Sequence, residues 1–257
     1  MFYLLLEKQT MNIKIAYVAL ASSVILSCGT VNEIMKGVEE VLNETTGTTN
    51  SIPSNLEIGN GLKEALVKGA SDGVLNLSKA GGYLDNAQFK IPFPKDAEKI
   101  ESTLRNIGLG SEVDKVIVSL NRAAEDAVTQ AKPLFVNAIK QMTFTDVKNI
   151  LMGDNMAATN YLKAKTNSQL QAAFKPKIQA SLDKVNATKY WTNVINTYNR
   201  LPLVTKLNPD LNSFVTEKAI QGLFTKIAQE EAAIRANPIQ RTTGLLKKVF
   251  GYADSQK

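Results

Sequence analysis

The segment SEVDKVIVSLNRAAEDAVTQAKPLFVNAIKQM, residues 111–142, decides the fold class. Its apolar residues recur in steps of three or four: Val113, Ile117, Leu120, Ala124, Val128, Ala131, Phe135, Ala138 and Met142. This spacing places them on one face of an α-helix, whose period is 3.6 residues. The segment therefore predicts a long amphipathic helix. We expect a kink at Pro133, because proline removes a backbone donor and crowds the preceding turn.

The same helical period continues on both sides of this segment. It predicts helices over about 61–80, 96–106, 145–152, 156–165, 168–184 (interrupted near Pro176), 188–200 and 211–236. Residues 83–94 read as a proline-punctuated loop, and no convincing strand pair appears. The segment TTGLLKKVFG, 242–251, has an apolar face that we expect to dock on the domain. The predicted fold class is all-α, with a single multi-helix domain over 56–257.

The N-terminal region predicts a signal peptide over residues 1–27. An apolar stretch ending at Leu26 follows Lys14, and it is shorter than the roughly 20 residues that span a bilayer. The first ten residues fit this pattern poorly because they add Glu7 and a second apolar patch. Met11, which opens the compact positive segment MNIK, is therefore a second candidate for the true start.

Cys28 is the only cysteine of the chain, and the run Leu26-Ser27-Cys28-Gly29 resembles a bacterial lipobox. That resemblance implies acyl chains on Cys28, and several chains hold a protein stably at a membrane. Residues 28–55 are rich in Thr, Asn, Ser and Gly, a composition that predicts a flexible tether. We expect a lipid-anchored protein of the cell envelope, on the periplasmic face of the outer membrane.

Composition restricts the function classes. The 257 residues include no histidine, so a histidine-based triad or zinc site would have to be built without it. The net charge of +6 is spread along the chain, which argues against a nucleic-acid partner. Asp154 and Asn155 are interpreted as a helix N-cap rather than metal ligands. We therefore expect no metal, no cofactor and a non-enzymatic protein, with paired carboxylates as the enzymatic alternative.

Polar residues interrupt the apolar faces of two predicted helices. On 111–142, Asn121 and Glu125 share one flank and Arg122 projects further out. This edge is either a polar wall of a pocket or a hydrogen-bond cluster that fixes helix packing. The pair Tyr190-Trp191 is interpreted as a core or interhelical aromatic pair.

The helix predicted over 211–236 places Glu230 inside its broad apolar sector. A buried carboxylate needs a partner, so we predict an ion pair between Glu230 and Arg122 or Arg241. Its neighbour Glu231 is spaced i,i+4 from Arg235, which predicts an ordinary helical ion pair of about 0.5 kcal/mol.

Four runs carry a resemblance to a known family: NRAAEDA, AATNYLKAKT, LNSFVTEKAIQGLFTKIAQEEAAIRANP and RTTGLLKKVFG. They resemble bacterial envelope proteins grouped as domain of unknown function 4197. The resemblance implies a helical domain, usually behind a signal peptide or lipobox, in Gram-negative bacteria, and it implies no reaction or ligand. The motif positions form a candidate polar cluster, binding or structural: Asn121, Arg122, Glu125, Thr159, Tyr161, Lys165, Thr166, Glu230, Glu231, Arg235, Arg241 and Thr242.

Three functions remain open at this point. The first is a non-enzymatic envelope lipoprotein that binds a protein partner or organises a complex. The second is a small-molecule or lipid-binding domain with a pocket between helices. The third is a hydrolase that uses two carboxylates, for example Glu125 with Glu230.

Overall fold

The structure, a computed structural model, describes residues 52–200, 202–203, 205–208 and 210–256. The expected signal peptide and lipobox, together with residues 28–51 of the expected tether, lie outside these residues. The described part is all-α and contains no strand, which confirms the predicted fold class. Helix α3 opens at Asn55, where Ser54 and Glu57 form a reciprocal capping box.

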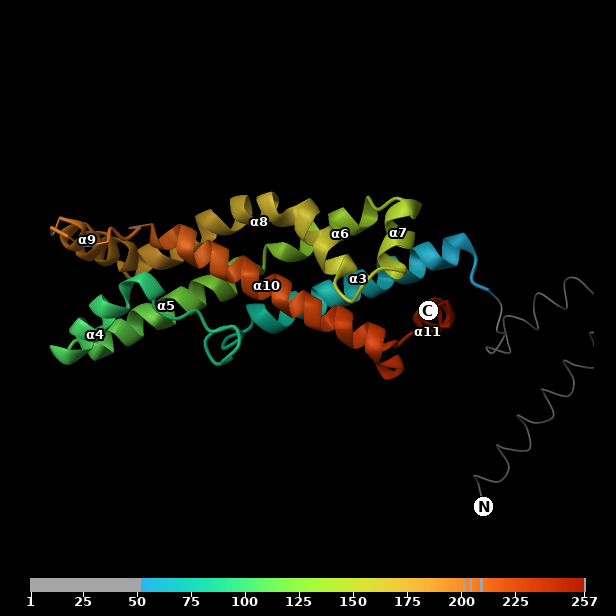
Figure 1. Cartoon of the computed structure of the whole chain (residues 1–257), viewed down its shortest axis with the longest axis horizontal. Helices are drawn as coiled ribbons and strands as arrows, with labels where there is room; N and C mark the ends of the chain where they lie inside the picture. Colours follow the sequence, from blue (N-terminus) through green and yellow to red (C-terminus); the bar gives the residue numbers. More distant parts are fainter. Residues whose placement is uncertain (1–51, 201, 204, 209, 257) are drawn as a thin grey trace, which may run out of the picture. The chain divides into compact units, whose positions relative to one another are not determined.

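The main helices run along a bundle and the short ones close its two ends (Figure 1). Helices α4 (Glu98–Asn106) and α9 (Ala187–Asn199) lie at one end, and α7 (Phe144–Leu151) and α11 (Gly244–Ser255) lie at the other (Figure 1). The helices are α3 (Asn55–Ser78), α4 (Glu98–Asn106), α5 (Gly110–Val128), α6 (Ala131–Lys140), α7 (Phe144–Leu151), α8 (Ala157–Lys184), α9 (Ala187–Asn199), α10 (Leu211–Ala236) and α11 (Gly244–Ser255), with 3-10 turns η1 (Lys95–Ala97) and η2 (Pro238–Gln240).

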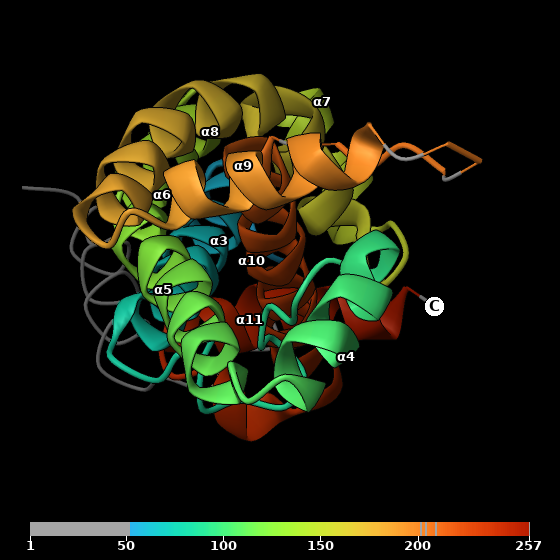
Figure 2. The ribbon, with the colours of Figure 1, turned by 90° about the vertical axis from the view of Figure 1, so that its left-hand side faces the viewer.

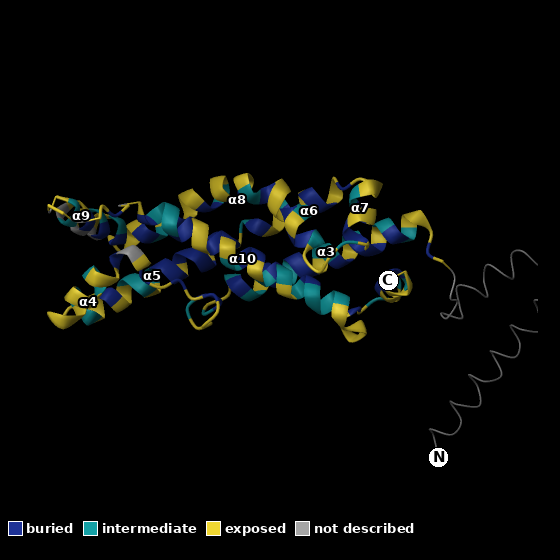
Figure 3. Cartoon of the chain, viewed as in Figure 1, coloured by how far each residue is buried: buried dark blue, intermediate teal, exposed yellow. Residues whose placement is uncertain are grey.

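Helix α10 is the centre of the core. It packs against α8, α3 and α5, and α8 also packs along α5. Buried residues line the inner faces of these helices and exposed residues line the outer faces (Figure 3). Among the described residues, no helix is both long and apolar enough to cross a membrane.

The segment 111–142 forms two helices rather than one kinked helix. α5 ends at Val128 and α6 begins at Ala131, so the break precedes Pro133. Pro133 lies in the first turn of α6, where its missing N–H has no partner to lose. The apolar period persists across the break because both helices face the same core.

Residues 157–184, expected as two helices, form the single helix α8 with Pro176 inside it. Pro176 is exposed, and the buried seam recurs every four residues: Ala158, Leu162, Thr166, Leu170, Phe174, Ile178 and Leu182. Thr166 is accommodated in this seam because its hydroxyl donates to the Leu162 carbonyl at 2.7 Å. Packing of the seam against α5 and α10 therefore outweighs the proline.

The loop between α3 and η1 contributes to the core as much as a helix does. Tyr83 is fully buried, and its hydroxyl donates to the Ala219 carbonyl of α10 at 2.6 Å. Burial, with a smaller contribution from the charge of Glu125, raises the pKa of Tyr83, so the phenol stays a donor. Gly222 of α10 lies against this ring, where a Cβ would approach Tyr83 Cε1 to 2.8 Å.

The C-terminal segment docks on the domain as expected, as helix α11 against α3. The Val249 side chain packs directly on Gly61, since a Cβ added to Gly61 would lie only 2.8 Å from Val249 Cγ2. Lys248 pairs with Glu57 at 2.7 Å. Hydrogen bonds from Lys248 and then Ser54 lower the pKa of Glu57 to about 2, so this carboxylate is charged at neutral pH.

The contact between Tyr83 and Gly222 predicts a selective effect of a single methyl group. We expect Gly222→Ala to lower the free energy of unfolding by about 1–3 kcal/mol, because the added methyl overpacks the ring. Gly59→Ala in α3 is the matched control, since a Cβ there meets no atom within 4 Å; it should be neutral or stabilising by about 1 kcal/mol or less. Urea denaturation followed by circular dichroism measures both, and equal effects would contradict the packing assignment.

Candidate functional site

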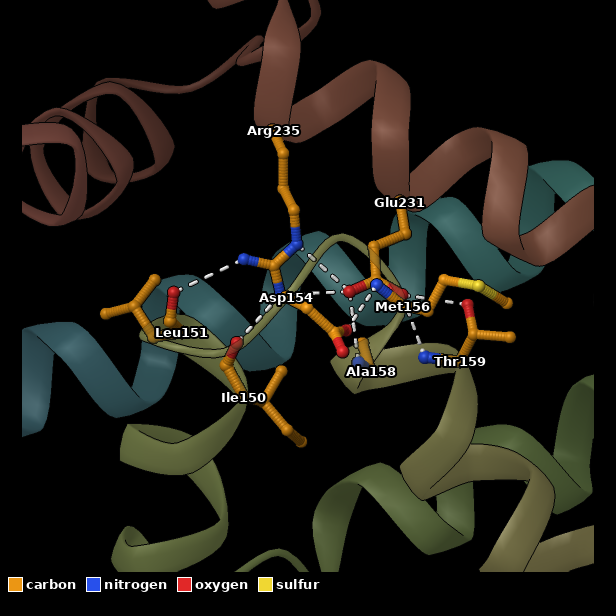
Figure 4. Close-up of polar contacts among 8 residues, drawn as sticks. All are labelled: Ile150, Leu151, Asp154, Met156, Ala158, Thr159, Glu231 and Arg235. Carbon is orange, nitrogen blue, oxygen red and sulfur yellow. Dashed lines mark hydrogen bonds and ion pairs between the residues drawn. The ribbon is translucent and has the colours of Figure 1, made fainter. Parts of the chain in front are cut away.

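Glu231 of α10 is the most deeply engaged carboxylate of the 211–236 helix. Its side chain is 5% exposed. Oε1 accepts from the Ala158 N–H at 3.0 Å, and Oε2 accepts from both the N–H and the hydroxyl of Thr159 at 2.8 Å (Figure 4). These donors belong to the first turn of α8, whose N–H groups have no partner inside the helix. Glu231 therefore caps α8, and the helix dipole favours its negative charge.

Arg235 lies one turn further along α10 and binds the end of α7. Its guanidinium donates to the carbonyls of Ile150 at 2.7 Å and Leu151 at 3.2 Å, and to Glu231 Oε1 at 2.9 Å (Figure 4). The side chain is 7% exposed. The pair therefore joins the end of α7 and the start of α8 to α10. The predicted i,i+4 ion pair is therefore present, but it is buried and also binds two other helices, unlike the ordinary helical ion pair that we expected.

The prediction for Glu230 is wrong. Its side chain is 23% exposed and pairs with Lys226 at 2.7 Å, not with Arg122 or Arg241. The physical reason is that the start of α8 and the end of α7 pack on the Glu231 side of α10, while Glu230 lies beside Gly69 of α3. Neighbouring residues on a helix are 100° apart, so this packing selects one carboxylate for burial and leaves the other at the edge.

Glu125 and Asn121 of α5 hold the loop that follows α3. Glu125 Oε1 accepts the N–H groups of Gly81, Tyr83 and Leu84, each at 3.1 Å, and Oε2 pairs with Arg122 at 2.6 Å. The Asn121 amide exchanges two 2.8 Å hydrogen bonds with the Ile91 backbone. Both residues share a flank of the helix as expected, but their partner is a loop rather than another helix.

We call these two sets of contacts, of Glu231 with Arg235 and of Glu125 with Asn121, polar ties. Arg241 forms a third polar tie, at the C-terminal end of α10. Its side chain donates to the carbonyls of Ile234 at 3.2 Å and Arg235 at 2.8 Å. It also pairs with Asp254 of α11 at 2.8 Å. Arg241 therefore caps α10 and attaches α11 to it.

The remaining candidates lie at or near the surface of α8 and the chain after α10. Lys165 is exposed and sits 5.7 Å from the ring centre of the half-buried Tyr161. Thr242 is exposed, and Asp154 accepts from the Met156 N–H at 2.8 Å in the turn before α8. The family-motif residues thus fall into separate structural ties rather than one cluster. Among the described residues, no group of three acidic or cysteine side chains is placed to hold a metal ion.

An apolar groove that the sequence did not predict lies at the end of the bundle formed by α4 and α9. Its lining residues come from the α4–α5 hairpin with Phe93 and from the segment between the end of α8 and α9. Figure 2 shows these helices from this end of the bundle. Its volume is about 750 Å³. The apolar lining is Phe93, Leu104, Leu109, Val113, Val116, Val118, Val185, Ala187 and Trp191.

Trp191 lies in the lining of this groove. It is 7% exposed, and its ring packs edge-on against Phe93 with ring centres 5.2 Å apart. Its buried indole N–H has no hydrogen-bond partner, and among the described residues it is the only side-chain polar atom in this condition. An unpaired buried donor costs about 1–3 kcal/mol. The expected burial of Trp191 is confirmed, and the side chain of Tyr190 lies outside the described residues.

The sequence carries only a weak signal of the groove. Three apolar side chains stay exposed along it: Leu109, which precedes Gly110, and the two valines Val118 and Val185 are 40–50% exposed. Single exposed apolar residues are common on protein surfaces, so only their convergence in space marks a site.

The two adjacent carboxylates of α10 provide a direct test of their different roles. We expect Glu231→Gln to lower the free energy of unfolding by about 3 kcal/mol or more, because it leaves the buried Arg235 without its counter-charge. Glu230→Gln, one residue away, should cost about 1 kcal/mol or less, as partly exposed ion pairs do. Urea denaturation measures both variants, and a larger loss for Glu230→Gln would contradict the assignment.

Comparison with known proteins agrees with the helical domain as a unit. Residues 52–251 match the model of the family described as "Protein of unknown function (DUF4197)". No curated protein and no solved structure matches the chain. The matched segment begins just before α3 and ends within α11, so it includes the Glu231–Arg235 pair, the Glu125 and Asn121 contacts and the whole groove. Because it covers most of the sequence, this chain belongs to the DUF4197 family.

Proposed function

We propose that this protein is a membrane-anchored, non-enzymatic binding module of the cell envelope. The observation that carries the proposal is the apolar groove between the α4–α5 hairpin and α9. Ligand sites are typically concave, apolar and about 300–1,000 Å³ in volume, and the groove has these properties. The exposed side chains of Leu109, Val118 and Val185 would be removed from water by an occupant.

The polar ties support a binding role over a catalytic one. Both oxygens of Glu125 and both oxygens of Glu231 accept hydrogen bonds from backbone N–H groups or arginine. A general acid must exchange a proton with substrate, and the oxygens of these two carboxylates are already engaged by groups of the protein itself. Glu230, the expected partner of Glu125 in a hydrolase, is engaged with Lys226 instead.

The anchor is the second part of the proposal. The sequence around Cys28 resembles a lipobox, so we place acyl chains on Cys28 and the protein on the periplasmic face of the outer membrane. Within the helical domain, the chain enters at the start of α3, at the end opposite α4 and α9 (Figure 1). An anchor attached at that end leaves the groove free to meet a partner or a small ligand.

Lipid attachment predicts a difference between two adjacent substitutions. We expect Cys28→Ala to abolish incorporation of a labelled fatty acid, because the acyl-carrying sulfur is gone. Ser27→Ala should keep the label, since alanine preserves a small residue before the cysteine. Metabolic labelling followed by membrane fractionation measures both, and label retained by Cys28→Ala would refute the anchor.

Occupancy of the groove can be tested on the protein as its own membranes hold it. Native mass spectrometry of the gently released lipidated protein should show extra mass, either a small ligand or a protein in fixed ratio. Val118→Arg should lose this mass because a charged side chain enters the apolar lining. Leu75→Arg is the control, since Leu75 is 68% exposed on α3, outside the groove. Absence of extra mass, or equal mass in both variants, would contradict a binding role for the groove.

A further inference from the structure

The lining of the groove restricts the chemistry of its occupant. Three charged residues contribute to it: Glu112, Asp114 and Lys115. Lys115 pairs with Glu112 at 2.8 Å, and Arg105 pairs with Asp114 at 2.8 Å. Each charge in the lining is therefore already neutralised by a neighbour. A peptide helix is usually oriented by complementary charges at the rim, whereas a hydrocarbon chain needs only apolar contact.

Trp191 also lines a second, smaller pocket of about 150 Å³, whose lining includes polar and acidic residues. These are Asn208, Asp210, Ser213 and Glu217. Hydrogen bonds from Ser213 lower the pKa of Asp210, so this pocket carries negative charge at neutral pH. Trp191 thus lines both an apolar groove and a smaller pocket that contains two carboxylates.

Trp191, whose buried indole N–H is unpaired, belongs to the lining of both cavities. Tryptophan is a donor only, so the group requires an acceptor such as a carbonyl oxygen. An acyl ester or amide has one such oxygen at the end of a hydrocarbon chain. A free fatty acid has a carboxylate there, which Asp210 and Glu217 would repel.

We infer that the groove binds the hydrocarbon chain of a lipid whose acyl group ends in an uncharged ester or amide, with its carbonyl oxygen accepting from Trp191 Nε1. The inference rests on the proposed function, because it names the ligand class of the same groove. The chain contacts Val113, Val118 and Val185, and the head points toward the polar pocket.

Trp191 is the only tryptophan of the chain, so its fluorescence reports on this site alone. The probe is a monoacylglycerol with a dibrominated stearoyl chain, since bromine quenches tryptophan on contact. The full-length chain carries Cys28→Ala in this experiment, which excludes the protein's own acyl chains. We expect saturable quenching by the brominated ester, none by the unbrominated ester, and weaker binding of the brominated free acid.

Two groove variants keep the test independent of folding defects. Val118→Arg and Val185→Arg should each weaken the brominated ester about tenfold or more, whereas Leu75→Arg should not. Their helical content and melting temperature are checked by circular dichroism. Unsaturable quenching, or equal quenching in the groove and control variants, would overturn the inference. Tighter binding of the free acid than of the ester would contradict the inference that the lipid has an uncharged head group.

The outcome is separable from that of the proposed function. If the protein released from membranes carries groove-dependent extra mass but the brominated ester does not quench Trp191, the groove is a binding site and its ligand is not an acyl lipid. If the extra mass is a bound protein partner, the binding role is likewise supported and the lipid ligand is contradicted. Loss of both signals rejects the groove as a binding site.

Discussion

The Glu231–Arg235 ion pair connects the central helix to two helix termini at once. Glu231 accepts from N–H groups that α8 cannot satisfy internally, and Arg235 donates to the carbonyls of Ile150 and Leu151 in the last turn of α7. Both charges have the sign that the adjacent helix dipole favours. Glu125 does the same for the loop after α3, and Arg241 for the end of α10. These charged residues thus satisfy backbone groups at helix ends or, for Glu125, in the loop that follows α3.

Helical periodicity predicted most of the fold because burial is decided by one face of each helix. The bounds of α10 were predicted in full, and α4 and α9 within two residues. Two errors concern proline, at Pro133 and Pro176. In both cases the sequence shows that a backbone donor is missing, but it does not show where in a helix the proline lies. Pro133 is tolerated because it lies in the first turn of α6, and Pro176 is tolerated on an exposed face of α8.

The polar sites were predictable only in part, for a geometric reason. The sequence identified Asn121 and Glu125 as one flank of α5 because both lie on the same helix. It could not choose between Glu230 and Glu231, since the choice depends on where the ends of α7 and α8 contact α10. The groove depends on the divergence of two hairpins that are far apart in the sequence, and no local pattern records that divergence.

The polar ties and the groove occupy parts of the bundle with different local packing. The end formed by α7, the start of α8 and α11 is held by the buried Glu231–Arg235 pair, by the Arg241–Asp254 pair and by the packing of α11 on α3. At the other end, α4 has no buried residue and no side-chain N-cap, and it packs on α5 and η1. Local stability follows buried contact, so the α4 side of the groove should open at a lower free-energy cost than the tied end. A binding surface at the weakly packed end can adjust to an occupant while the tied end keeps the bundle intact.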